Sequence, residues 1–244
     1  MVSCLKQTYE INKSDALLIT DIQKDFLPGG ALPVSGGDEI IPALNWYARF
    51  FESAKGYVFA SRDWHPANHV SFKAQGGLWP LHCVQNTKGA NFSPDLILPG
   101  DTGVISKAMD PKKEGYSVFD GTLFADELRI RGVKRLFVGG LATDYCVVNT
   151  VIDSRKLGYD TVVLMDATMG INVKPDDVDK AIQAMLKAGA QQATMVDFSD
   201  AVEKLTTAQD APDAMEEESS ERAAVKKKSR MRPKGSSKRV RTEK

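Results

Sequence analysis

Short apolar runs alternate with longer amphipathic stretches over most of the chain. This alternation is typical of βαβ units, which build a mainly parallel sheet with helices on both faces. We therefore predict a doubly wound α/β fold. The predicted strands are residues 15–21, 57–62, 103–107, 135–141, 161–165 and 192–196, and the predicted helices are residues 37–53, 124–131, 144–156 and 175–188.

Reactive side chains stand at the ends of several predicted strands. Asp21 closes the first strand, Asp63 follows the second, and Lys107 closes the third. Cys146 comes shortly after the fourth, at the start of a predicted helix. Because ligands of open parallel sheets bind beyond the carboxyl ends of the strands, we expect these side chains to meet at one edge of the sheet.

All three histidines, His65, His69 and His82, lie in one irregular segment close to Asp63. Two histidines and a carboxylate leave coordination positions open, which suits a catalytic rather than a structural metal ion. Zinc, iron and manganese all accept such a mixed ligand set. The sequence therefore predicts a divalent metal ion on Asp63, His65 and His82, although a single histidine is more often a satisfied core or surface residue.

Cys146 is the candidate nucleophile. In the first turn of a helix, backbone N–H groups and the helix dipole favour the thiolate, so we expect a lowered pKa for this thiol. Asp21 would accept the thiol proton and return it to the leaving group, while Lys107 would keep Asp21 ionised. Taken alone, Cys146 also fits an inert core thiol, and Asp21 with Lys107 also fits a structural ion pair.

The small residues before Cys146 suggest an oxyanion hole. Gly139 and Gly140 let the backbone turn sharply before the helix, so that the N–H groups of Ala142 and Cys146 can point at a developing oxyanion. An ordinary strand-to-helix turn explains the glycine pair as well.

The composition limits the partners and the cellular compartment that we expect for the protein. The 244 residues include 32 Lys and Arg and 32 Asp and Glu, so no net charge attracts acidic partners. No apolar run approaches the ~20 residues that span a bilayer, and the first residues lack a signal-peptide core. The three cysteines are an odd and sparse set, which favours reduced thiols over a disulfide scaffold. We expect a cytoplasmic protein with no membrane partner.

The chain changes character near residue 206. Residues 210–221 are acidic and rich in alanine, and residues 222–244 are strongly basic. Such a segment cannot bury enough apolar surface to offset its ordering entropy, so we predict a folded domain over residues 1–205 and a disordered tail over residues 206–244. The basic clusters at 226–228 and 238–241 fit either a nuclear import signal or a merely solvated tail.

Four segments in order and spacing match one family. They are TDIQKDF at residues 20–26, RDWHPANHVSF at 62–72, WPLHC at 79–83 and GLATDYCV at 140–147. With these motifs the chain resembles the nicotinamidases of the isochorismatase-like cysteine hydrolases over about residues 15–198. The resemblance implies the isochorismatase-like fold and the hydrolysis of nicotinamide to nicotinate and ammonia. It places a thioester intermediate on Cys146, with Asp21 as proton shuttle and Lys107 as its partner.

The resemblance also implies the metal and the substrate contacts. A divalent ion on Asp63, His65 and His82 would hold the ring nitrogen of the pyridine; we expect zinc, with iron or manganese as alternatives. His69 stays outside the expected ligands. The remaining implied substrate-binding residues are Phe26 and Trp79, which sandwich the ring, together with Leu141 and Tyr145. The Leu141–Ala142 peptide bond is expected to be cis.

The motifs are compatible with further substrates and with two rival functions. Pyrazinamide is an expected second substrate, because it offers the same ring nitrogen and amide. The resemblance implies a role in NAD salvage and is compatible with a homo-oligomer. A rival within the family is a metal-free cysteine amidohydrolase of carbamoyl or ureido substrates. A rival of another class is a nucleic-acid-binding protein that acts through its basic tail.

Overall fold

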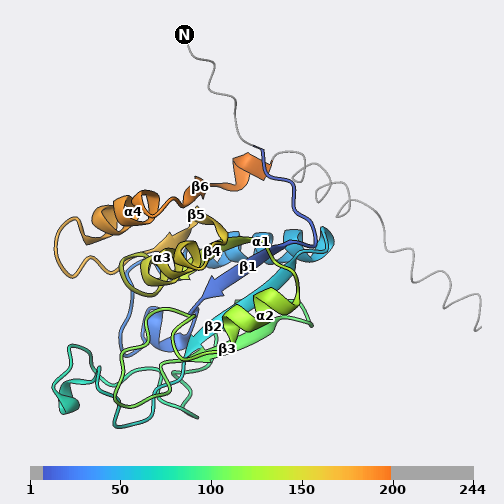
Figure 1. Cartoon of the computed structure of the whole chain (residues 1–244). Helices are drawn as coiled ribbons and strands as arrows, with labels where there is room; N and C mark the ends of the chain where they lie inside the picture. The colour runs from blue at the N-terminus through green and yellow to red at the C-terminus, as the bar shows by residue number, and fades with distance from the viewer. Residues whose placement is uncertain (1–7, 199–244) are drawn as a thin grey trace, which may run out of the picture. The chain divides into compact units, whose positions relative to one another are not determined.

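The predicted alternation of strands and helices folds into one six-stranded sheet in which all neighbouring strands are parallel (Figure 1). The computed structural model describes residues 8–198. The sheet order is β3-β2-β1-β4-β5-β6. The strands are β1 (Asp15–Thr20), β2 (Tyr57–Asp63), β3 (Gly103–Lys107), β4 (Arg135–Leu141), β5 (Asp160–Met169) and β6 (Gln191–Ala193).

Helices cover both faces of this sheet, which confirms the doubly wound α/β prediction (Figure 1). They are α1 (Ile41–Ser53), α2 (Phe124–Ile130), α3 (Val148–Lys156) and α4 (Asp177–Lys187). In β1, Ala16 and Leu18 pack in one buried cluster with residues of α2, α3 and α4. On the opposite face Phe51 of α1 packs edge-on against Phe137 of β4, with ring centroids 5.1 Å apart. The alternation of strand side chains between the two faces therefore explains why the apolar runs are continuous.

Several boundaries differ from the predicted ones. β1 ends at Thr20 because Asp21 adopts a positive φ of 53°, which takes it out of the ladder. The last strand stops at Ala193, and the chain then forms a 3-10 turn over Met195–Phe198 in place of the predicted strand end. The helix predicted from residue 144 begins with a π-helical turn, Thr143–Val147, before α3. Local sequence patterns do not encode these ends, which depend on pairing with neighbouring strands.

The strand order places the candidate residues together. β1 and β4 are neighbours, and the chain moves outwards through β2 and β3 on one side and through β5 and β6 on the other. The crevice at such a switch point is where open α/β sheets bind ligands. Within residues 8–198 no helix is long and apolar enough to cross a membrane. The predictions for the tail from residue 206, including its disorder and nuclear import, fall outside the described residues.

Gly140 shows how tightly β1 and β4 meet at this switch point. Its φ is 110°, and a Cβ there would lie 2.1 Å from the backbone oxygen of Thr20. We expect Gly140→Ala to lower the free energy of unfolding by about 3 kcal/mol, because both the dihedral angle and the contact are unfavourable. Chemical denaturation measures this change. Gly158→Ala is the matched control, since Gly158 has a φ of 89° but nothing within 4 Å of the added Cβ; a cost equal to that of Gly140→Ala would show that the contact is irrelevant.

Candidate active site

Lys107 joins the strand-end residues into one buried cluster. Its Nζ lies 2.8 Å from Asp21 Oδ2 and 2.5 Å from Asp63 Oδ1. The same ammonium group lies 3.2 Å from Cys146 Sγ and 3.3 Å from the carbonyl oxygen of Gly115. The register explains this meeting, because Asp63 is paired directly with Lys107 across β2 and β3. The structure thus brings the four predicted strand-end side chains together, as expected.

Burial and charge together set the protonation of Lys107 and its carboxylates. Burial alone would lower the pKa of Lys107, but Asp21 and Asp63 outweigh it and hold that pKa well above its usual value. Burial raises the pKa of Asp21, against the opposing effect of Lys107. For Asp63 burial also opposes ionisation, yet Lys107 and His65 keep its pKa below the usual value. Lys107 is therefore a permanent cation, and Asp21 is the carboxylate with the greater proton affinity.

The predicted lowering of the Cys146 pKa is wrong for this site. Burial raises the pKa of the thiol well above its usual value; Lys107 opposes this effect, while Asp21 and Asp63 add to it. The helix start alone favours the thiolate, but desolvation dominates in a fully buried cluster. The resting thiol therefore keeps its proton until a base removes it. Asp21 is placed for this, because Ser61 donates a hydrogen bond of 2.7 Å to its Oδ1, leaving Oδ2 toward the cluster.

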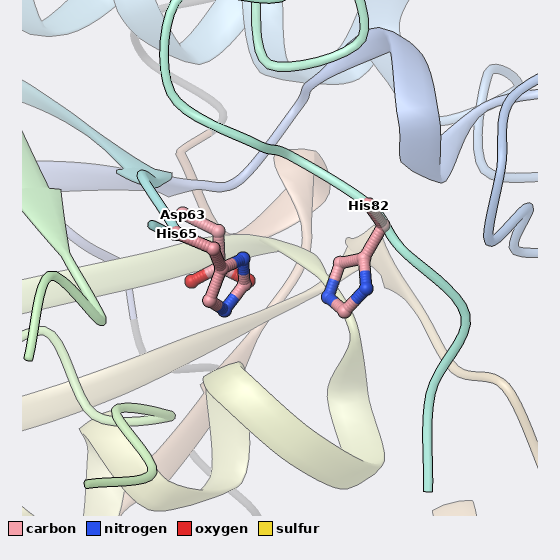
Figure 2. A group of neighbouring side chains, drawn as sticks. All are labelled: Asp63, His65 and His82. Atoms are coloured by element: carbon pink, nitrogen blue, oxygen red, sulfur yellow. The ribbon is translucent and has the colours of Figure 1, made fainter. Parts of the chain in front are cut away.

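A second group of side chains adjoins this cluster and shares Asp63 with it. Asp63, His65 and His82 each offer a ligand atom, and these atoms all lie within 4.8 Å of one another. Figure 2 shows Asp63 and His65 together at the end of β2, with the His82 ring facing them from a separate segment. Backbone hydrogen bonds of a short parallel bridge between His65 and Val84 hold the two segments side by side.

The chemistry of these donors fits a divalent cation. Burial lowers the pKa of His65 to about 4, so its ring is neutral near pH 7 and its lone pair is available. The buried Nδ1 of His65 has no hydrogen-bond partner among residues 8–198, which a bound ion would remedy. His82 uses Nδ1 to donate to the Pro80 carbonyl oxygen at 2.8 Å, which leaves its Nε2 free to bind. The predicted set of two imidazoles and one carboxylate is therefore assembled and suits a metal ion.

His69 lies outside this group. Its Nε2 donates to the carbonyl oxygen of Lys113 at 3.0 Å, and its Nδ1 accepts a hydrogen bond from the Ser71 hydroxyl at 2.7 Å. Both ring nitrogens are thus used within the protein. The exclusion of His69 from the expected ligands agrees with this geometry.

A hollow opens beside Cys146. Two aromatic contacts shape its walls: Trp79 and Tyr145 meet edge-on at 5.0 Å, and the Phe26 ring lies 5.5 Å from that of His82. Leu141, the remaining predicted substrate residue, also lines it, as does Ala142, a predicted oxyanion donor. The Leu141–Ala142 peptide bond is cis, as the resemblance implied. Cys146 therefore lines one cavity together with the predicted substrate residues and with Asp63 and His82 of the metal-binding group.

Several residues that shape this site carried no signal in the sequence. Tyr116, Leu32 and Ile171 line the hollow, and Tyr116 accepts a hydrogen bond of 3.1 Å from the Trp79 indole. Asp144 accepts the backbone N–H of Ile171 at 2.9 Å, which holds that residue at the rim. Tyr116, Leu32 and Ile171 stand in loops without periodicity, so only the folded chain reveals them.

A buried thiol, carboxylate and ammonium at the carboxyl ends of parallel strands, beside an apolar hollow, define a cysteine hydrolase of the α/β class. Comparison with known proteins agrees. The isochorismatase domain family matches residues 15–197, and the chain belongs to this family.

Known relatives resemble most of the chain. The nicotinamidase of Escherichia coli strain K12 is 39% identical over 206 residues, which cover 76% of this chain and 97% of the relative. The pyrazinamidase of Pyrococcus horikoshii, whose structure is known in complex with zinc, has 49% sequence identity to this chain. The two structures match with a TM-score of 0.71 over 74% of this chain and 99% of that one. The structure of PnC1 from L. infantum in complex with nicotinate is 33% identical, with a TM-score of 0.70, covering 78% and 98%.

Proposed function

We propose that this protein is a nicotinamidase that hydrolyses nicotinamide to nicotinate and ammonia and also acts on pyrazinamide. The observation that carries the proposal is the position of Cys146, which lines the same hollow as Asp63 and His82 of the metal-binding group. Such a cavity can hold a flat ring by one end and present its amide to the thiol at the other. The named activities of the E. coli and P. horikoshii relatives support this assignment.

The first chemical step is attack by Cys146. Asp21 removes the thiol proton, and Sγ forms a bond to the amide carbon as the carbonyl π electrons move to oxygen. The N–H groups of Ala142 and Cys146 are the proposed donors to that oxyanion. Asp21 then gives its proton to the nitrogen, ammonia leaves, and a thioester remains on Cys146. Asp21 then deprotonates a water molecule, which attacks the thioester carbon. The C–S bond breaks, Asp21 returns the proton to Sγ, and the acid leaves as nicotinate.

Lys107 and the aromatic residues support these steps without moving a proton themselves. Lys107 keeps a positive charge beside Asp21 and stabilises its ionised form. Phe26 and Trp79 offer flat apolar surfaces to the ring, which need no exact polar match. When bound to Asp63, His65 and His82, a divalent ion supplies a Lewis acid that can hold the pyridine nitrogen. We propose zinc, as in the P. horikoshii complex, with iron and manganese as alternatives.

The rival functions explain less. A metal-free amidohydrolase of carbamoyl or ureido groups gives no reason for the unpartnered Nδ1 of the buried His65 ring. A nucleic-acid-binding function rests on the basic tail, and it does not account for the cluster around Cys146. Nuclear import and self-association of the chain stay predictions, and the import signal falls on residues outside the described part of the chain.

Removal of the metal should abolish the activity. After chelation we expect ammonia release from nicotinamide to fall by at least about 100-fold, because the ring nitrogen loses the group that holds it. Added zinc, iron or manganese should restore the rate, and the metal that does so at the lowest concentration identifies the preferred ion. Full activity of the chelated protein would contradict a metal-dependent nicotinamidase. Inactivity of the metal-loaded protein on nicotinamide, with turnover of a ureido substrate, would support the rival amidohydrolase.

A further inference from the structure

Gln23 lies between the ends of β1 and β2, and its side chain is completely buried. Its amide Nε2 donates hydrogen bonds to the carbonyl oxygens of Asp63, at 2.8 Å, and Ala90, at 2.9 Å. Its Oε1 accepts the backbone N–H of Asp63 at 2.7 Å. Both amide hydrogens and the amide oxygen are thus used, and two of the three bonds hold the backbone of a single residue.

Asp63 belongs to both groups of the site, the ion-pair cluster and the metal-binding group. The Asp63 carboxylate contacts Lys107 at 2.5 Å and also belongs to the group of donors with His65 and His82. A small rotation of the Asp63 backbone would therefore disturb the ion pair and the metal-binding group at once. Bonds to both N–H and C=O of one peptide residue resist such a rotation, because they fix it at two points.

The backbone of Gln23 connects the same region to Asp21. Its N–H donates to the Asp21 carbonyl oxygen at 2.8 Å, and the Asp21 N–H donates to Ser61 of β2 at 3.2 Å. Asp21 and Asp63 are the two carboxylates that flank Lys107. Gln23 therefore contacts both of their backbones, although it does not line the hollow beside Cys146.

We propose that Gln23 is a positioning residue that orients Asp63 toward both Lys107 and the divalent ion. The inference rests on the proposed metal-dependent amidase function and deepens it. Groups that orient metal ligands through hydrogen bonds typically change metal affinity or activity by about 10- to 100-fold when they are removed. A role limited to folding would lower stability and leave the metal affinity of the folded protein unchanged.

The test compares two glutamines that bond to adjacent backbone positions. Gln23→Met keeps the approximate shape and removes all three bonds to the amide. Gln85→Met is the matched control, because within residues 8–198 the Gln85 amide makes a single hydrogen bond, which it donates to the carbonyl oxygen of Trp64 at 2.8 Å. Zinc affinity of each folded variant is measured by competition with a chromophoric chelator, without substrate. The kcat and KM for nicotinamide are then measured at saturating zinc.

For Gln23→Met we expect zinc affinity to fall by about 10- to 100-fold and kcat to fall at saturating zinc, with KM within about threefold of the wild type. Gln85→Met should stay within about threefold of the wild type in all three quantities.

If Gln23→Met does not fold, Gln23→Glu serves instead, since it keeps an acceptor for the Asp63 N–H but loses both donors. The same fall in zinc affinity is expected. A folded Gln23 variant with wild-type zinc affinity and kcat overturns the proposal. The zinc affinity is measured without substrate. If the wild-type protein binds zinc but does not hydrolyse nicotinamide, that result counts against the proposed substrate alone.

Discussion

Replacement of Cys146 by alanine is expected to reduce ammonia release from nicotinamide by at least about 10⁴-fold. No other thiol lines the hollow, since Cys83, the only other cysteine in residues 8–198, is absent from its walls. Without Sγ there is no atom to form the thioester, and the remaining groups can only orient water. The kcat/KM of the purified, zinc-loaded variant measures the loss.

Cys83→Ala is the matched control for this experiment. Cys83 is also a buried free thiol whose pKa is raised by burial and by nearby carboxylates, but it does not line the hollow. We expect it to keep kcat/KM within a few-fold of the wild type. Cys146→Ala should in addition retain its zinc affinity and its folded stability. A Cys146→Ala protein with more than about one per cent of wild-type activity would show that the thiol is not the nucleophile.

The sequence predicted the site because its members follow parallel strands. Asp21, Asp63 and Lys107 end or follow predicted strands, so residues far apart in the chain were expected to meet at one edge of the sheet. The register of β2 and β3, which the sequence did not predict, places Asp63 directly opposite Lys107. The three histidines were equally informative, since their clustering beside Asp63 has few purely structural explanations. Residues at strand ends and clusters of scarce residues can be recognised in the sequence before the packing is known.

What the sequence did not predict depends on packing. The pKa of Cys146 is set by burial and by two neighbouring carboxylates, whereas the sequence showed only its position at a helix start. Gln23 is one polar residue in the connection after β1, and its bonds to Asp63 arise only when β1 and β2 lie side by side. The early end of β1 at Thr20 has the same origin, because Asp21 leaves the ladder to reach the cluster.

The substrate pocket and the metal-binding group are coupled through one carboxylate. Asp63 contacts Lys107, and Lys107 contacts both Asp21 and Cys146. Charge at the metal-binding group therefore acts on the nucleophile through a chain of direct contacts. This arrangement accounts for the burial of Lys107, an otherwise costly position for an ammonium group.

Removal of that ammonium group should have the largest effect on stability. In Lys107→Met two buried carboxylates, Asp21 and Asp63, lose the cation between them. We expect the free energy of unfolding at pH 7 to fall by about 3 to 5 kcal/mol, the usual cost of leaving a buried charge unpaired. Nicotinamide hydrolysis should be lost as well. Chemical denaturation of the metal-free proteins measures the change in stability.

The pH dependence separates this cause from a simple loss of packing. Burial already raises the pKa of Asp21 against the opposing effect of Lys107, so the variant should have a still higher pKa. Its folded state then binds a proton that the unfolded chain releases above about pH 4, and stability increases as the pH falls. The loss of unfolding free energy in Lys107→Met relative to the wild type should therefore be greatest near pH 7 and shrink toward pH 4.

Lys156→Met is the control, since the ion pair of Lys156 with Asp153 is on the surface and its removal should cost less than about 0.5 kcal/mol. A deficit for Lys107→Met that is independent of pH would mean that the lost contacts, not the unpaired carboxylates, destabilise the protein.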